Sequence, residues 1–398
     1  MAFVVAGRFY LASPKSAFSL PNTRAANVCG QKTNAGKVPV FFGVPLSPLS
    51  QRRQSRVSFH SSKIVSQETS SLVQDTTTLG SLTVPSLGIG IWAWGDRLYW
   101  GYNPAQDQEL KNAYRACLDA GLNMFDTAEV YGPGRSEELL GDFAQTESGF
   151  DADGKKREII VLTKFAALPW RVGPASVVCA CKDSLKRLRA DSMALYQQHW
   201  PGVWQNDEYL DGLAEVVNKG LAKEVGVSNF NVKRTKAAVE RLKSKGVTLA
   251  SNQVQFSLLY RDPELNGLLD TCGELGIKLI AYSPIAQGLL TGRYNENNLP
   301  TGPRARLYTP EKLRSIKPLI ETLREIGAQY GGKTPGQVAL NWIICKGALP
   351  IPGAKNTAQV SELAGALGWR LSASDIAALD SESRRVQGNI PGMPLANL

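Results

Sequence analysis

Apolar and polar positions follow two alternating patterns from about residue 80 to residue 370. Short apolar runs predict buried strands at 122–127, 159–164, 193–199, 223–229, 251–256, 277–283 and 348–353. The intervening stretches have the spacing of amphipathic helices, at 107–120, 176–189, 207–219, 231–245, 263–275 and 311–330. With a first strand near 86–92, this gives eight strand–helix units, which favour an α/β fold of the (β/α)8 TIM barrel type. An open doubly wound sheet is the structural alternative.

The first 67 residues differ in composition from the rest. They hold nine Lys or Arg residues and ten Ser residues, and the first acidic residue is Glu68. This composition is typical of an organelle transit peptide and favours a plastid, whereas a disordered basic tail is the plainer alternative. We therefore expect a plastid transit peptide at 1–67 and a single barrel domain at 68–398. The expected location is the chloroplast stroma, and association with plastid lipid bodies (plastoglobules) is compatible with it.

Charge and cysteine content exclude several classes of protein. The chain has 45 Lys+Arg and 35 Asp+Glu, so removing the nine basic residues of the leader leaves 36 against 35, a net charge of +1. A nearly neutral body gives no reason to expect a nucleic-acid partner. No apolar stretch of the leader is long enough to span a membrane. The six Cys residues include no Cys-x-x-Cys pair, which argues against a zinc site or disulfide scaffold and favours buried filler roles.

Two glycine motifs resemble nucleotide-binding loops without the required context. Gly88–Ala93 matches G-x-G-x-x-A, but the residues that follow, rich in Trp and Gly, do not predict a helix. Gly327–Thr334 matches G-x-x-x-x-G-K-T, but a helix rather than a strand precedes it, and Thr334 with Gln337 predicts a capping box. We reject both motifs as nucleotide sites.

Polar residues stand where several predicted strands end, which in a barrel is the edge that carries the active site. Asp126, Lys164 and His199 end three successive strands, and Tyr131 follows Asp126 by five residues. Since His199 is the only histidine after residue 60, a metal site with several imidazoles is excluded. Taken singly, Asp126 with Lys164 could be a structural ion pair, Tyr131 an ordinary loop residue and His199 a core residue.

Together these four residue types suit the reduction of a carbonyl group. A nearby ammonium favours the tyrosinate form, so we expect Lys164 to lower the pKa of Tyr131 and make it a usable general acid. His199 can donate a hydrogen bond to a carbonyl oxygen and orient it. Protonation of that oxygen leaves the carbon needing a hydride, which no side chain supplies, so a reduced nicotinamide cofactor is expected.

At these residues the chain resembles the aldo-keto reductase superfamily, and most closely its plant plastid oxidoreductases and the potassium-channel β-subunit branch. The motifs run in family order: NMFDTAEVYG at 123–132, VLTK at 161–164, HWP at 199–201, GVSNF at 226–230, NQVQ at 252–255, YSPIAQGLLTGRY at 282–294 and IPGAK at 351–355. The resemblance implies a catalytic tetrad of Asp126, Tyr131, Lys164 and His199 and an NADPH (or NADP+) cofactor. The implied cofactor contacts are Trp92, Asp126, Ser228, Asn229, Gln253, Tyr282, Ser283, Pro284, Ile285, Gly288, Arg293, Gly353, Lys355, Gln359 and Glu362.

The chain departs from the family pattern at Leu363, where Asn is common, and at Ile91, where Thr is common. Both changes concern the affinity for the cofactor rather than the chemistry. A cluster of Trp and Tyr residues near the first, third and fourth strand ends predicts either an aromatic substrate wall or simple loop packing. The expected activity is NADPH-dependent reduction of an aldehyde or ketone, and the alternative is an NADPH-bound regulatory subunit with little turnover.

Overall fold

The structure is a computed structural model that describes residues 75–149, 154, 157–302, 305 and 308–386. The transit peptide expected at 1–67 lies outside these residues, so it stays a prediction.

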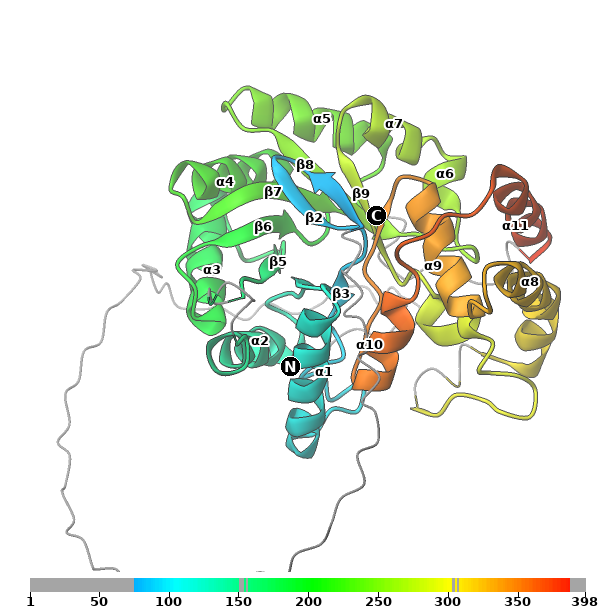
Figure 1. The fold of residues 1–398 in the computed structure, drawn as a ribbon. Coiled ribbons are helices and arrows are strands. Elements are labelled where there is room, and N and C mark those ends of the chain that lie inside the picture. Colours follow the sequence, from blue (N-terminus) through cyan, green and yellow to red (C-terminus); the bar gives the residue numbers. More distant parts are fainter. Residues whose placement is uncertain (1–74, 150–153, 155–156, 303–304, 306–307, 387–398) are drawn as a thin grey trace, which may run out of the picture. The chain divides into compact units, whose positions relative to one another are not determined.

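Eight parallel strands form the centre of the domain (Figure 1). They are β3 (Ile89–Gly90), β4 (Met124–Asp126), β5 (Ile160–Phe165), β6 (Met193–Gln198), β7 (Ala222–Ser228), β8 (Leu249–Gln255), β9 (Lys278–Tyr282) and β10 (Leu349–Pro350). Each strand pairs with the next in chain order. The predicted TIM barrel is confirmed.

Contacts between the first and last strands close the barrel. The amide of Gly88 donates to the Pro350 carbonyl at 3.0 Å, and that of Gly90 to the Pro352 carbonyl at 2.9 Å. A parallel bridge joins Gly90 to Gly353. These contacts exclude the open doubly wound sheet. A β-carbon on Gly90 would lie 2.8 Å from the Ile351 carbonyl oxygen, so this closure requires glycine.

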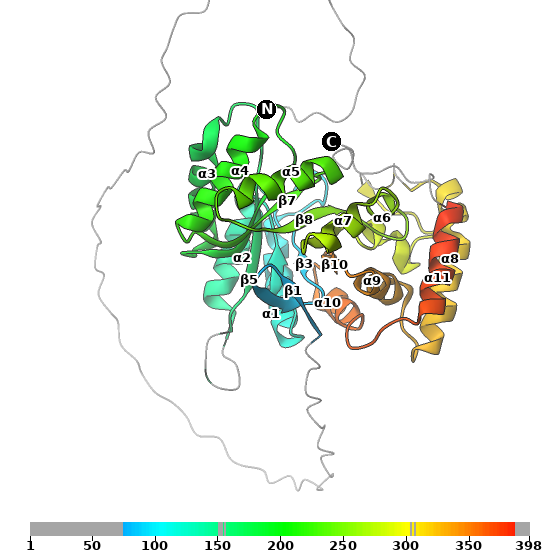
Figure 2. The ribbon, with the colours of Figure 1, turned by 90° about the horizontal axis from the view of Figure 1, so that it is seen from above.

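Helices surround the strands in both views (Figures 1 and 2). They are α1 (Asp107–Asp119), α2 (Arg135–Thr146), α3 (Gly173–Leu188), α4 (Asn206–Asn218), α5 (Val232–Lys243), α6 (Asp262–Leu265), α7 (Leu268–Glu274), α8 (Pro310–Gln329), α9 (Pro335–Cys345), α10 (Thr357–Ala364) and α11 (Ala373–Val386). The helix predicted at 263–275 is wrong as one element. Gly267, with a φ of 78°, separates α6 from α7.

An antiparallel hairpin that the sequence patterns did not reveal precedes the barrel. It consists of β1 (Thr76–Leu79) and β2 (Leu82–Pro85). The amide and hydroxyl of Ser81 donate to the Glu224 carboxylate at 2.8 and 2.6 Å, which ties the turn to the start of β7. Leu79 and Val84 are buried among side chains of the barrel interior. The hairpin therefore closes the amino-terminal end of the barrel, and the strand predicted at 86–92 contracts to the two residues of β3.

The two glycine motifs that were rejected as nucleotide sites have the structural context that the sequence predicted. Turns follow Gly90, and the P-loop-like segment is the corner between α8 and α9, where Thr334 and Gln337 form the predicted capping box. No described helix is long and apolar enough to cross a bilayer. Cys117, Cys181 and Cys272 are buried as expected, whereas Cys179 is exposed, so the filler role is wrong for it.

Candidate active site

A buried ion pair lies at the carboxyl ends of β4 and β5. Lys164 Nζ donates to Asp126 Oδ1 at 2.5 Å and to the Thr127 carbonyl at 2.7 Å, and both charged side chains are almost fully buried. Burial lowers the pKa of Lys164 from its ordinary value, while the Asp126 charge opposes that change. The carboxylate thus favours the charged form of an ammonium that no water reaches.

Two buried amides occupy the other oxygen of Asp126. Gln253 Nε2 donates to Asp126 Oδ2 at 2.8 Å, and Gln197 Nε2 lies 3.4 Å from the same atom. Gln253 was expected at the cofactor, whereas Gln197 was missed. A signal for Gln197 existed, because it lies on β6 two positions before His199, which directly follows the strand, and the period of a strand puts both on one face.

Tyr131 follows β4 in a loop that turns back over the ion pair. Lys164 Nζ lies 5.1 Å from the centroid of the Tyr131 ring. Burial, followed by the charges of Asp126 and Asp96, raises the pKa of Tyr131 well above its ordinary value. The expectation that Lys164 lowers this pKa is therefore wrong for the structure, because desolvation and two carboxylates raise it. Like any phenol, Tyr131 is protonated at neutral pH and holds a proton to donate, but burial makes it a weaker acid than the sequence predicted.

His199 lies on the far side of Tyr131, with its ring centroid 5.7 Å from the Tyr131 centroid and nearly perpendicular to it. Burial, and to a smaller extent the charge of Lys164, lowers the pKa of His199 well below its ordinary value. Its Nδ1 is buried and has no hydrogen-bond partner in the described part of the chain. The imidazole is therefore neutral, and as such it can donate one hydrogen bond.

Polar groups also meet at the ends of β7, β8 and β9. Ser228 Oγ donates to the Gln253 carbonyl at 2.7 Å, Asn229 Nδ2 donates to Ser228 Oγ at 3.1 Å, and Tyr282 OH donates to Asn229 Oδ1 at 3.1 Å. Asn229 has a φ of 62°, an unusual value that turns its side chain out of the strand direction. The structure thus brings these four residues together beside the ion pair, as the motifs predicted.

The remaining predicted cofactor residues form two segments. Ser283, Pro284, Ile285 and Gly288 follow β9 in a tight turn, where Ser283 has a φ of 51° and Gly288 one of 103°. Arg293 is exposed farther along that loop. Gly353 and Lys355 precede α10, and Gln359 and Glu362 lie on it. Gln359 accepts from the Lys355 amide at 2.7 Å, and Glu362 bonds to Thr334 Oγ1. Leu363, the departure from the family pattern, is buried in the core.

The aromatic cluster divides between the two roles left open. Trp94 is fully buried against Phe125 and Phe143, so it packs the core. Trp92 lies 6.0 Å from Tyr131 between ring centroids, and Trp200 lies 4.6 Å from His199. These two rings therefore stand beside the reactive groups, whereas Trp170 and Trp204 are 74% and 71% exposed on the surrounding loops.

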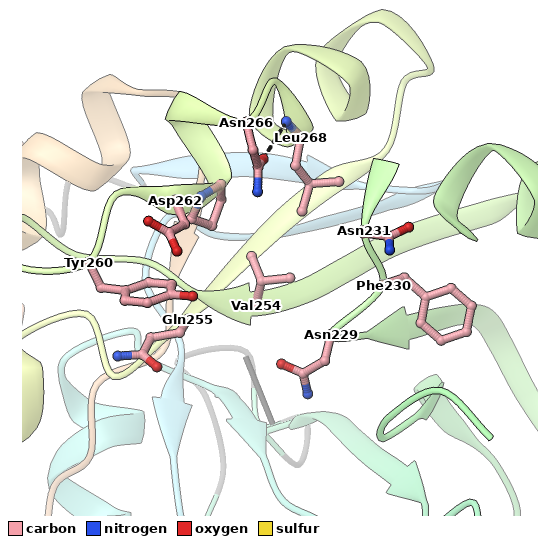
Figure 3. Close-up of a pocket in the computed structure, with 10 residues that line it drawn as sticks. Asn229, Phe230, Asn231, Val254, Gln255, Tyr260, Asp262, Asn266 and Leu268 are labelled. Atoms are coloured by element: carbon pink, nitrogen blue, oxygen red, sulfur yellow. Dashed lines mark hydrogen bonds between the residues drawn. The ribbon is translucent and has the colours of Figure 1, made fainter. Parts of the chain in front are cut away.

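A separate cleft of about 220 Å³ lies next to this site, beyond Asn229 (Figure 3). Its lining comes from the ends of β7 and β8, from α6 and the loops on either side of it, and from the start of α7. Figure 3 shows Tyr260 and Gln255 on one side of it and Phe230 on the other. None of the four tetrad residues lines this cleft, so the cleft adjoins the reactive groups without containing them.

Comparison with known proteins gives a consistent result. Residues 86–384 match the model of the aldo/keto reductase family. The chain belongs to the aldo/keto reductase family. A chloroplastic pyridoxal reductase of Arabidopsis thaliana is 45% identical over 302 residues, which cover 74% of this chain and 82% of that protein.

Solved aldo/keto reductases share the fold. A Klebsiella pneumoniae enzyme in complex with NADP and acetate is 28% identical, with a TM-score of 0.63, over 81% of this chain and all of that one. A glycerol dehydrogenase of Gluconobacter oxydans is 26% identical, with a TM-score of 0.67, over 81% and 98%. The family and fold expected from the motifs are thus confirmed, and the chain is an oxidoreductase of the aldo/keto reductase family.

Proposed function

We propose that this aldo/keto reductase uses NADPH to reduce an aromatic aldehyde to its alcohol, with Tyr131 as the proton donor. The observation that carries this is the convergence of Asp126, Lys164, Tyr131 and His199 at the ends of three neighbouring strands. Tyr131 carries its proton at neutral pH, as a phenol ordinarily does, and a neutral His199 can hold the substrate's carbonyl oxygen near the phenol. The ion pair between Lys164 and Asp126 lies beneath the phenol ring and holds the polar groups there in place.

The residues present fit a nicotinamide cofactor. Ser228, Asn229 and Gln253 offer amide and hydroxyl groups suited to a carboxamide, and the half-buried ring of Tyr282 is placed among them. Lys355 at the start of α10 offers a cation for the 2′-phosphate that distinguishes NADPH from NADH. When bound, NADPH supplies the hydride that the carbonyl carbon accepts, while the proton for the carbonyl oxygen comes from Tyr131.

An aromatic aldehyde is the substrate class that the site supports best. The ring of Trp92 lies beside Tyr131 and that of Trp200 beside His199, and flat apolar surfaces favour a flat substrate. The similarity to the Arabidopsis pyridoxal reductase points in the same direction, so pyridoxal is the first compound to test.

The test measures NADPH consumption by the chain without residues 1–67, with pyridoxal, benzaldehyde and an aliphatic aldehyde. Tyr131→Phe should lower kcat by about 10²–10⁴-fold, the range for a lost general acid, and Lys164→Met should do the same. Tyr330→Phe is the matched control, because that hydroxyl bonds to Asp375 on the outer helices and its removal should leave kcat unchanged. Equal turnover by Tyr131→Phe and the parent would refute the proposed role. Tight NADPH binding without turnover of any aldehyde would favour the regulatory subunit instead.

We also propose that the chain acts in the plastid. The support is the basic, acid-free composition of residues 1–67 and the chloroplastic relative. Residues 1–67 fused to a fluorescent protein should direct it into chloroplasts, and a cytosolic signal would contradict this. Association with plastid lipid bodies stays a prediction, and flotation of the mature chain with purified lipid bodies tests it.

A further inference from the structure

The loop after β3 folds around one carboxylate at the mouth of the active site. Trp92 Nε1 donates to Asp96 Oδ2 at 2.7 Å, and the Tyr99 amide donates to Asp96 Oδ1 at 2.8 Å. The Tyr102 amide donates to the Asp96 carbonyl at 2.9 Å. Asp96 is half-buried, and no lysine or arginine in the described part of the chain forms an ion pair with it. Its position is therefore fixed by the loop while its charge is uncompensated.

This carboxylate adjoins the reactive groups through Trp92. The Trp92 ring stacks on Tyr99 at 5.0 Å between centroids, with an interplanar angle of 12°, and it also contacts Trp100 at 5.6 Å and Tyr131 at 6.0 Å. The negative charge of Asp96 contributes to the raised pKa of Tyr131, so its field reaches the phenol. The charge of Asp126, by contrast, is balanced by Lys164.

The other cationic side chains near the mouth are paired with a carboxylate, exposed to solvent, or part of the segments expected to contact the cofactor. Arg171, on the loop after β5, is paired with Glu129. Arg97 follows Asp96 directly but is exposed, so solvent screens its charge more strongly. Lys355 and Arg293 belong to the two segments that the resemblance implies as cofactor contacts. Arg135, which packs against Gly95 of the same loop, is paired with Asp107. Among the described residues near the mouth, Asp96 is thus a carboxylate without an ion-pair partner.

We propose that Asp96 determines substrate charge, so that the enzyme prefers aldehydes with a cationic or N–H-donating ring over aldehydes that carry phosphate or carboxylate. This inference rests on the proposed carbonyl reductase function. Each oxygen of Asp96 accepts one hydrogen bond from the loop and keeps a further lone pair for a donor on the substrate. A protonated ring nitrogen, as in pyridoxal, suits this acceptor, whereas the phosphate ester of the same aldehyde brings a like charge towards it.

The test compares three aldehydes of similar shape: benzaldehyde, 4-(trimethylammonio)benzaldehyde and 4-carboxybenzaldehyde. Their kcat/KM values are measured with NADPH for the parent and for Asp96→Asn, a variant that keeps the size of the side chain and one acceptor oxygen. Because each aldehyde is compared with itself across the two proteins, its intrinsic reactivity cancels. We expect kcat/KM to fall about tenfold for the cation, to rise about threefold for the anion and to change less than twofold for benzaldehyde. Arg97→Gln removes a positive charge at the neighbouring position, and it should alter the kcat/KM values of the three aldehydes less than Asp96→Asn does.

A second measurement needs no variant and so does not depend on how Asp96→Asn folds. In the parent enzyme, raising the ionic strength from about 0.02 M to about 0.5 M should shrink the preference for the cation over the anion, because salt screens the half-exposed charge. An equal loss for all three aldehydes in Asp96→Asn, or a salt-independent preference, would overturn the inference and leave the proposed function standing. A larger effect of Arg97→Gln would overturn it as well. If the parent reduces none of the three aldehydes and does not reduce pyridoxal either, the proposed function itself is refuted.

Discussion

Glu129 joins the loop that carries Tyr131 to the end of the strand that carries Lys164. It stands two residues before Tyr131, its side chain is 8% exposed, and its carboxylate accepts from the Ala166 amide at 2.6 Å and from Arg171 Nη2 at 3.0 Å. Arg171 Nη1 bonds to the same carboxylate. We predict that Glu129→Gln loosens this connection and misplaces the Tyr131 phenol.

The expected loss of stability in Glu129→Gln depends on which hydrogen bonds of the Glu129 carboxylate the variant keeps. Gln can still accept from the Ala166 amide, but the charge-assisted bonds to Arg171 are lost, and such bonds contribute about 1.5–3 kcal/mol. Since Arg171 is 24% exposed and also donates to the Ala166 carbonyl at 3.1 Å, we expect the lower part of that range, about 1.5–2 kcal/mol of unfolding free energy. A misplacement of about 1 Å in a reacting group can cost about 10²-fold, so kcat should fall by about 10–100-fold.

The assay combines urea unfolding, NADPH titration and steady-state kinetics with pyridoxal. The affinity for NADPH should not change, because Glu129 lies by β4 and β5, away from the ends of β7 to β10 where the cofactor is proposed to bind. Glu215→Gln is the matched control, since it breaks an exposed pair with Lys219 on α4 and should affect neither measurement. A loss of stability with less than a threefold change in kcat would show that Glu129 is structural only.

Three further predictions follow from burial and contact. Because His199 remains neutral through the physiological range, kcat/KM should be flat from about pH 6 to pH 9, and an acidic limb near pH 6.5 that disappears in His199→Gln would contradict this. Asp380 on α11 accepts from Trp342 Nε1 at 2.9 Å and pairs with Lys346 at 2.7 Å. Asp380→Asn should therefore lower the free energy of unfolding in urea by about 2–4 kcal/mol, and a loss below about 1 kcal/mol would contradict the role of this network. Gly90→Ala should lower the thermal midpoint measured by circular dichroism, because its β-carbon would meet the Ile351 carbonyl, and an unchanged midpoint would show that the closure can relax.

The parts of this fold that follow a period were predictable from the sequence. Six of the eight strands are regular runs, and the tetrad residues stand at or just after strand ends, where position in the chain fixes position in space. The runs at 86–92 and 348–353 predicted β3 and β10 but not their length of two residues each, and the β1–β2 hairpin depends on the distant Glu224. The pKa of Tyr131 was predicted with the wrong sign, because the pattern shows which charges are near but not how deeply the phenol is buried.

Asp126 connects the two halves of the proposed site. Its Oδ1 accepts from Lys164 on β5 and its Oδ2 from Gln253 on β8, so one carboxylate contacts residues from both the proton-donor side and the nicotinamide side. Burial lowers the pKa of Lys164, and the charge of Asp126 opposes that change. Since Lys164 and Gln253 are held by the same carboxylate, the proposed geometry for a cofactor amide and the geometry that supports Tyr131 depend on a single buried pair.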